Sequence, residues 1–398
     1  MKYIIFLIDG AADYPLEQLN GKTPLMVAKK PNIDALCHKG ACGLFKSIPD
    51  EMPTGSAVAN LSVLGYNPKK CFEGRGVLEA ASMNVDVHSD ELALRCNLIC
   101  VESGKIKNHS AGHISSEEAA ILIDDLNKNL GSEKVKFYPG VSYRHLLIIK
   151  DDKFSKKINC APPHDHPNER IKDLLIGGDE LTSRFLNDLI LKSNAFLENH
   201  PVNLAREKSG KDKANYIWPW SPGKKPKMKT FSELYGKTGA VISAVDLIKG
   251  IGKYAGLEII NVDGATGLFD TNYEGKADAC VRALKKFDFV FCHVEASDEA
   301  GHEGDIDLKI KTIEYFDKRL LARALNGFTE IDDEITIAIL PDHFTPCELR
   351  IHTREPVPFL IFNPQKMSDD VNKFDEKNCS RGSLGTLQND ELIKMIFE

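Results

Sequence analysis

The sequence predicts an α/β fold: a mostly parallel sheet with helices on both faces, interrupted by a smaller inserted α+β domain. Two observations favour this class. Apolar runs alternate with helical segments through most of the second half of the chain, a rhythm typical of βαβ units. Three of the apolar runs also end abruptly in Asp or His. With 398 residues, the chain is too long for one small core and should form two domains.

The first strand is predicted at residues 2–8, an apolar run that stops at Asp9. A helix is expected at residues 31–39, with Gly40 as its C-terminal cap. Another helix should begin at about Ser56. These are the first elements of the predicted domain with the parallel sheet.

The pattern changes after Gly74-Arg75-Gly76. Residues 92–101 and 141–149 are expected to form strands, and residues 115–130 an amphipathic helix. A Pro- and His-rich stretch, residues 161–167, should lead out of this module. We therefore predict one domain at residues 1–80 and 176–398 and an inserted domain at residues 81–175.

The second half of the chain begins with a helix at residues 178–200 and an irregular, basic stretch at residues 206–226. Strands and helices then alternate, which implies right-handed crossovers and a parallel sheet. The expected strands are 239–244, 257–262, 288–294, 334–340 and 357–362, and the expected helices are 245–254, 273–287, 305–326 and 386–397.

Carboxylates and imidazoles follow these strands. Because ligands gather at the carboxyl edge of a parallel sheet, these groups should meet in the fold. Asp298 and His302 are expected in a loop in which Gly301 allows a tight turn; taken alone, this pair is as well explained by a helix cap and a surface histidine. The whole set suits two divalent metal ions, with Mn favoured over Zn, Co or Mg. It comprises Asp9, Asp298, His302, Asp342, His343 and His352.

Ser56 lies at the predicted start of a helix, where free backbone N–H groups stabilise an anion on its oxygen. A serine or threonine there could equally be a helix cap. A nearby metal site favours the nucleophile, because metal coordination activates a hydroxyl.

Composition excludes several classes of function. The net charge of −7 argues against nucleic-acid binding. No run of 18 apolar residues and no signal-peptide pattern is present, so we expect a cytoplasmic protein with no membrane partner. The ten cysteines are scattered, and we interpret them as reduced core residues.

The motifs together resemble the archaeal-type 2,3-bisphosphoglycerate-independent phosphoglycerate mutases, a branch of the alkaline phosphatase superfamily. The resemblance spans nearly the whole chain. It is carried by Asp9-Gly10, Pro53-Thr54-Gly55-Ser56, Leu64-Gly65-Tyr66-Asn67-Pro68, residues 74–80, Tyr143-Arg144-His145, residues 239–250, Asp298 with His302, Asp342-His343 and His352.

The resemblance implies an alkaline-phosphatase-like fold and a division of the ligands between two ions. Asp9, Ser56, Asp342 and His343 would hold one ion, and Asp298, His302 and His352 the other. Ser56 would accept the phosphoryl group of 3-phosphoglycerate and return it to give 2-phosphoglycerate. The basic groups expected to contact this phosphorylated substrate are Arg75, His113, Arg144, Arg206 and Lys237.

One segment departs from the family pattern. Many archaeal-type members of the family have an acidic residue followed shortly by Ala-Gly-Arg where this chain has Asn108-His109-Ser110-Ala111-Gly112-His113. This segment resembles the part that recognises the substrate hydroxyls. It leaves open a homoserine kinase-like phosphotransferase as the main alternative to the mutase. A metal-dependent phosphatase and a non-enzymatic, metal-stabilised binding protein are further alternatives.

Overall fold

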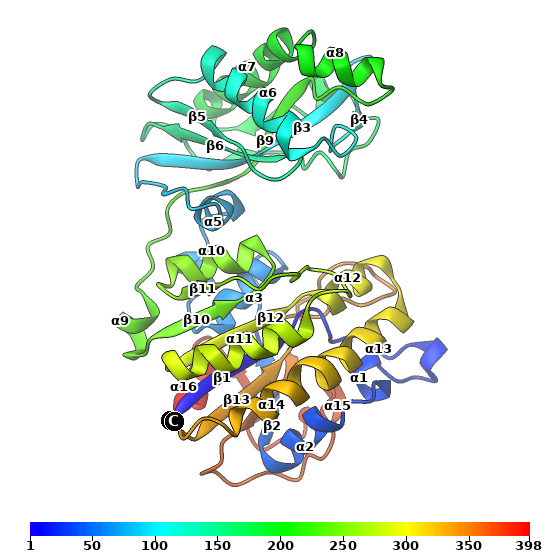
Figure 1. Cartoon of the computed structure of the whole chain (residues 1–398), viewed down its shortest axis with the longest axis vertical. Helices are drawn as coiled ribbons and strands as arrows, with labels where there is room; N and C mark the ends of the chain where they lie inside the picture. Colours follow the sequence, from blue (N-terminus) through cyan, green and yellow to red (C-terminus); the bar gives the residue numbers. More distant parts are fainter. The chain divides into compact units, whose positions relative to one another are not determined.

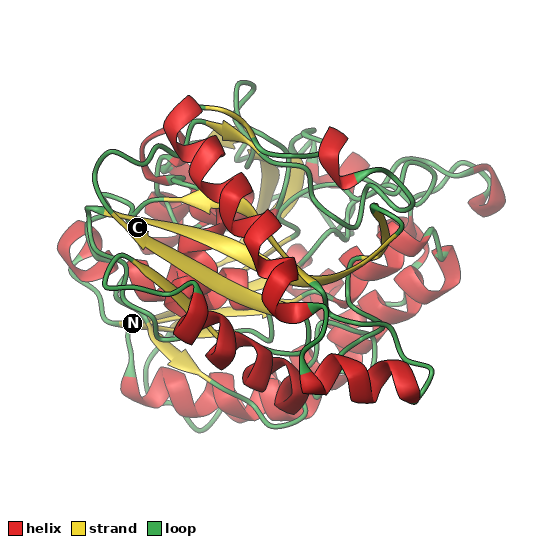
Figure 2. Cartoon of the chain, turned by 90° about the horizontal axis from the view of Figure 1, so that it is seen from above, coloured by secondary structure: helices red, strands yellow, loops and turns green.

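A computed structural model describes residues 1–398 of the chain (Figure 1). The chain forms two compact units. Unit 1 comprises Met1–Phe72 and Lys227–Glu398, and unit 2 comprises Glu73–Pro226. Helices and strands account for most of the chain (Figure 2). None of the helices is both long enough and apolar enough to span a membrane.

Unit 1 is built on an eight-stranded sheet with the order β11-β10-β12-β1-β13-β14-β2-β15. The five strands β11, β10, β12, β1 and β13 are parallel to one another, as expected. Strand β14 is antiparallel to both of its neighbours, β13 and β2. The central strands are buried along their whole length, which explains their continuous apolar sequences. The strands are β1 (Lys2–Ile8), β2 (Ala41–Lys46), β10 (Gly239–Ile242), β11 (Glu258–Ile260), β12 (Phe289–Val294), β13 (Ile335–Leu340), β14 (Val357–Phe362) and β15 (Thr386–Gln388).

Helices cover both faces of this sheet. On one face, Ile4 and Phe6 pack in a core with residues of α2, α11 and α14. On the other face, Tyr3 and Phe289 contact the rings of Phe397 and Phe231. The helices of unit 1 are α1 (Pro24–Val27), α2 (Pro31–Lys39), α3 (Ser56–Val63), α4 (Pro68–Cys71), α9 (Phe231–Tyr235), α10 (Asp246–Tyr254), α11 (Tyr273–Lys286), α12 (Ala296–Glu303), α13 (Ile306–Tyr315), α14 (Ala322–Phe328), α15 (Glu376–Cys379) and α16 (Glu391–Phe397).

Two expectations for unit 1 need correction. The helix expected at 305–326 is α13 and α14 joined by a π-helical turn, Phe316–Leu321. The helix expected at 386–397 begins only at Glu391, because residues 386–388 pair with β2 as the edge strand β15. A three-residue edge strand is too short to give a sequence pattern of its own.

Unit 2 is an α+β structure whose strands are all antiparallel. Its sheet has the order β4-β3-β6-β5, with β9 also paired to β3. Helices α6 and α7 share a core with this sheet. The main elements are α5 (Arg75–Ser82), β3 (Glu91–Glu102), β4 (Lys105–Asn108), α6 (Ser116–Asn129), β5 (Val135–Tyr138), β6 (Arg144–Lys150), α7 (Glu180–Leu197), α8 (Pro201–Lys208) and β9 (Tyr216–Gly223).

Unit 2 is larger than the expected module at residues 81–175, because the stretch 206–226 is not irregular. It contains β9, which pairs with β3 and buries Trp218 and Trp220 against the core. Pro219 and Pro222 interrupt its sequence pattern, and such prolines are tolerated because β9 pairs along one side only. Helices α7 and α8, which precede β9 in the sequence, therefore lie in unit 2 as well.

Candidate active site

The first group of ligand-type side chains lies where two neighbouring parallel strands end. Asp9 follows β1, and Asp342 and His343 follow β13. The Nε2 atom of His343 lies 3.5 Å from Oδ1 of Asp9 and 3.4 Å from Oδ2 of Asp342. All three side chains are buried. They could hold a metal ion in common.

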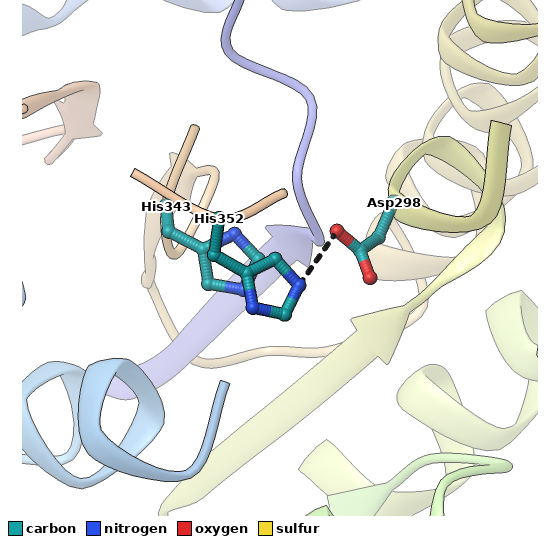
Figure 3. A group of neighbouring side chains, drawn as sticks. All are labelled: Asp298, His343 and His352. Carbon is teal, nitrogen blue, oxygen red and sulfur yellow. Dashed lines mark ion pairs between the residues drawn. The ribbon is translucent and has the colours of Figure 1, made fainter. Parts of the chain in front are cut away.

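The second group lies beside the first. Asp298 and His302 are four residues apart on α12 and so share one face of that helix. Oδ2 of Asp298 is 3.3 Å from Nε2 of His302, and its Oδ1 is 3.5 Å from Nε2 of His352. The two Nε2 atoms are 2.8 Å apart. Figure 3 shows Asp298 facing the rings of His352 and His343, a set that could also hold a metal ion.

The helical placement of Asp298 and His302 corrects the expected loop. Gly301 lies inside α12 and makes no turn. A Cβ atom there would come within 2.5 Å of the backbone oxygen of Thr345. Glycine at this position therefore allows α12 to pack closely against the loop after β13.

Ser56 is the first residue of α3, as the sequence predicted. Its Oγ lies 3.1 Å from Nε2 of His343. The preceding residue, Gly55, has φ of 143°, a conformation that glycine adopts without strain. No side chain caps α3, so its N-terminal N–H groups and dipole favour negative charge near Ser56.

The charges of the first group fit a cation. Oδ1 of Asp9 is buried without a hydrogen-bond partner. Burial, together with repulsion from Asp342 and Asp298, raises the pKa of Asp9 well above its usual value. Burial lowers the pKa of His343, which favours the neutral imidazole that binds metals. A bound cation would offset the repulsion between the carboxylates and supply Oδ1 with a partner.

The second group has a different balance. Burial acts to raise the pKa of Asp298, but hydrogen bonds from His302 and His352 outweigh it and hold that pKa well below the usual value. The hydrogen bond to Asp298 raises the pKa of His302 to about 9. A metal ion would compete with the proton on His302.

Two supporting residues were not identified from the sequence. His293 on β12 is fully buried, and its Nε2 lies 2.8 Å from Oδ2 of Asp9. Burial lowers the pKa of His293 to about 3. Asn60 on α3 donates to the backbone oxygen of Ser56 and to Oδ2 of Asp342, both at 2.8 Å. Their signal in the sequence is weak, since a single His in a strand and a single Asn in a helix are common.

Close packing fixes the loops that carry the ligands. The Oγ1 atom of Thr345 donates to Oδ1 of Asp298 at 2.5 Å. Gly10 has φ of 60°, and a Cβ atom there would lie 2.5 Å from the same oxygen of Asp298. Lys309, fully buried, donates to Asp13 and to the backbone oxygens of Ala12 and Thr345. The loops after β1 and β13 are therefore tied together.

The predicted substrate contacts are divided by the structure. Three of them lie in unit 2 as exposed side chains: Arg75, His113 and Arg144. The rings of His109 and His113 lie 5.5 and 6.3 Å from the ring of Tyr143. The Arg144 guanidinium is 5.7 Å from the same ring. Unit 2 thus gathers exposed basic groups around an aromatic side chain.

A second part of this cluster lies around Trp220. The guanidinium of Arg95 stacks 4.1 Å from the Trp220 ring, and the His164 ring is 5.3 Å away. Arg75 and Arg144 are close enough to Arg95 to help lower its pKa, although burial is the larger cause. Arg95 could not be singled out from the sequence, because it lies inside the apolar strand β3.

Arg206 does not fit the predicted role of a substrate contact. Its side chain is 2% exposed, and its guanidinium donates to Glu118 and to the backbone oxygens of Ala111 and Asp212. The bond to Ala111 supports a turn in which residues 111–113 all have positive φ. Arg206 therefore holds the turn that carries His113.

Lys237 also does not fit. It precedes β10, and its Nζ lies 4.4 Å from the ring centre of Tyr3, which is near the start of β1. The metal-ligand candidates follow the opposite ends of the parallel strands. Tyr3 and Asp9 are six residue steps apart along the extended chain, which is roughly 20 Å. Lys237 therefore lies at the end of the strands opposite to the metal-ligand candidates.

The buried carboxylates and imidazoles beside a serine, at the carboxyl ends of a mostly parallel sheet, define the class of this protein as an α/β enzyme. A family model described as 2,3-bisphosphoglycerate-independent phosphoglycerate mutase matches residues 37–203. A protein of that name from Methanosarcina barkeri is 53% identical over 399 residues, with all of both chains covered. The chain belongs to the family of 2,3-bisphosphoglycerate-independent phosphoglycerate mutases.

Two solved structures are similar to this chain over its whole length. A protein from Pyrococcus horikoshii is 31% identical, with a TM-score of 0.84, covering 100% of this chain and 96% of that one. The cofactor-independent phosphoglycerate mutase from Thermoplasma acidophilum is 26% identical, with a TM-score of 0.70, covering 100% of this chain and 99% of that one. The resemblance inferred from the motifs is therefore confirmed.

Proposed function

We propose that this chain interconverts 3-phosphoglycerate and 2-phosphoglycerate in glycolysis and gluconeogenesis through a phosphoserine on Ser56. The observation that carries the proposal is the position of the Ser56 hydroxyl, 3.1 Å from His343 and at the N-terminus of α3, beside a group of buried carboxylates and imidazoles. Full-length relatives that bear the mutase name support it over the kinase and phosphatase alternatives.

Two groups of side chains would hold divalent metal ions. Asp9, Ser56, Asp342 and His343 would hold one, and Asp298, His302 and His352 the other. The mixed carboxylate and imidazole donors suit Mn, with Zn, Co or Mg as alternatives. When bound, such ions supply positive charge that stabilises the attacking and leaving oxygens of phosphoryl transfer.

The chain's own groups then account for the transfer. Ser56 loses its proton as a bond forms between its Oγ and phosphorus, while the bond from phosphorus to the 3-oxygen of glycerate breaks and that oxygen takes up a proton. In the second half, the 2-hydroxyl loses its proton, attacks the phosphoserine and releases Ser56, which is protonated again. No nucleotide or bisphosphoglycerate is consumed, because the phosphoryl group and the protons balance within one substrate molecule.

Recognition of the substrate is proposed for the exposed basic groups of unit 2. Arg75, His113 and Arg144 present cationic or hydrogen-bonding groups suited to the carboxylate and phosphate of phosphoglycerate. Unit 2 would thus contribute substrate contacts and no metal ligand. We place the enzyme in the cytoplasm, acting on a small phosphorylated molecule without nucleic-acid or membrane partners.

The test is a product analysis on the purified protein with Mn and 3-phosphoglycerate, following 2-phosphoglycerate and inorganic phosphate in parallel. The mutase should form 2-phosphoglycerate without added ATP or 2,3-bisphosphoglycerate. Accumulation of free phosphate in its place would indicate a phosphatase. Conversion of homoserine only in the presence of ATP would indicate the kinase.

Metal dependence is tested separately. Chelation should abolish turnover without unfolding the chain, because the hydrophobic core of unit 1 is built from apolar side chains and does not depend on the metal ligands. Addition of Mn to the chelated protein should restore activity. Full activity of verified metal-free protein would contradict the dimetal proposal.

A further inference from the structure

His293 contacts Asp9 from the neighbouring strand. It lies in β12 opposite Leu7 of β1, so that its ring reaches the carboxylate just past the end of β1. The Nε2 atom is 2.8 Å from Oδ2 of Asp9, and both side chains are buried. The proposed reaction uses Asp9 but gives His293 no part.

Both nitrogens of this ring have a partner. Nδ1 of His293 lies 3.2 Å from Oγ of Ser243. That Oγ accepts a hydrogen bond from the backbone N–H of Val245 at 3.0 Å, and its own proton can point to Nδ1. An ionised Asp9, the form that binds a metal ion, can only accept hydrogen bonds, so the ring proton is on Nε2 and is donated to Oδ2 of Asp9.

The two oxygens of Asp9 consequently have different partners. Oδ2 accepts from His293, whereas Oδ1 is buried without a hydrogen-bond partner and lies 3.5 Å from Nε2 of His343. We infer that His293 and Ser243 are positioning residues that hold Asp9 with Oδ1 facing the metal ion. This inference rests on the ligand set of the proposed function. Such outer hydrogen bonds typically contribute 10- to 100-fold to metal affinity.

The other two carboxylates are held in other ways. Oδ2 of Asp342 accepts from Asn60, and Oδ1 of Asp298 accepts from Thr345. Loss of His293 should therefore weaken the ion bound by Asp9 and leave the ion bound by Asp298 in place. This selectivity distinguishes positioning of one ligand from general damage to the fold.

The experiment is a titration of metal-free protein with Mn, reading bound and free Mn rather than turnover. Wild type should bind two ions. His293→Leu should bind one of them about 10- to 100-fold more weakly. His293→Gln retains an N–H donor at the matching place and should recover most of this loss. His145 is a buried histidine of unit 2, and His145→Leu is therefore the matched control. This variant should bind Mn as wild type does.

Each outcome decides a different point. Wild type that binds no Mn contradicts the ligand set of the proposed function. Wild type that binds two ions, with His293→Leu titrating identically, overturns only the role of His293. Equal defects in the Gln and Leu variants would exclude the donated proton as the cause. Should His293→Leu fail to fold, Ser243→Ala replaces it, and unchanged Mn binding in that variant overturns the inference.

Discussion

The two units place their functional groups in opposite environments. In unit 1, the carboxylates of Asp9, Asp298 and Asp342 are almost completely buried, and each is held by neighbouring side chains. In unit 2, Arg75 and Arg144 are exposed. Hydrogen bonds from neighbouring side chains orient the ligands of a metal ion, whereas long cationic side chains can adjust to an anionic substrate. The proposed function therefore assigns the chemistry to the buried groups of unit 1 and recognition to the exposed groups of unit 2.

Substitution of Ser56 gives the largest expected effect, because it removes the oxygen that forms the bond to phosphorus in the proposed mechanism. Ser56→Ala should lower kcat on the order of 10⁴-fold or more. Phosphoserine should disappear from the acid-quenched protein, as measured by mass spectrometry. The remaining carboxylates and imidazoles should still retain part of the metal.

A serine that takes no part in the chemistry predicts a different result. The variant would then keep most of its turnover. Unit 2 provides the internal control, since its folding should be unaffected by the change. Retained turnover with normal metal content would remove Ser56 from the mechanism.

Arg144 and Arg206, both in unit 2, should respond differently to substitution, because Arg144 is exposed and Arg206 is buried. Arg144→Ala should raise KM for 3-phosphoglycerate about 10- to 100-fold, the effect of one lost charged hydrogen bond. The Tm should stay unchanged because the side chain is exposed. Arg206→Ala should instead lower the free energy of unfolding by about 3 kcal/mol, since it removes a buried guanidinium from its partners.

The measurements are steady-state kinetics and urea unfolding of both variants. Arg206→Ala is the matched control for the loss of one guanidinium from the same unit. A large loss of stability in Arg144→Ala, or a fully stable Arg206→Ala, would reverse the assignment of the two residues.

The sequence predicted the parts of the site that follow strands. Asp9 and Asp342 stand directly after long apolar runs, and a parallel sheet brings such positions together. His293 could not be found in this way, because it lies inside a strand and its role depends on which strand is the neighbour of β1. Sequence spacing carries no information on strand order.

The basic residues were predicted less well for a related reason. A positive side chain suits an anionic substrate only if it is free and on the correct edge of the sheet. Arg206 is bonded to Glu118 and Ala111, and Lys237 lies at the opposite edge from Asp9. Both facts follow from tertiary contacts between segments distant in sequence. The strand β9 was missed because two prolines hide its pattern.

A buried histidine of unit 2 should make that unit sensitive to acid. Burial lowers the pKa of His145 to about 3, below its value in the unfolded chain. The unfolded chain therefore takes up a proton as the pH falls below about 6.5, and the folded chain does not until about pH 3. Stability is lost over that window, by about 2 kcal/mol between pH 7 and pH 5.

Urea unfolding at the two pH values, in wild type and His145→Asn, measures this contribution. The Asn oxygen can accept the backbone N–H of Gly140 that Nδ1 of His145 accepts at 3.0 Å. The variant should lose less stability on acidification than wild type. An identical pH dependence would mean that His145 is protonated in the folded state.

Substitution of Lys237 should have the smallest effect on activity and stability. It tests whether any of the predicted substrate-binding cations lies in unit 1. Its ammonium lies 4.4 Å from the ring centre of Tyr3 and 5.0 Å from that of Phe397. Cation–π contacts at partly exposed sites contribute about 0.5–1 kcal/mol, so Lys237→Ala should lower stability by no more than this. Because the metal-ligand candidates lie at the other edge of the sheet, KM and kcat for 3-phosphoglycerate should equal those of wild type. A tenfold rise in KM with unchanged stability would instead return Lys237 to the substrate site and contradict the placement of all recognition in unit 2.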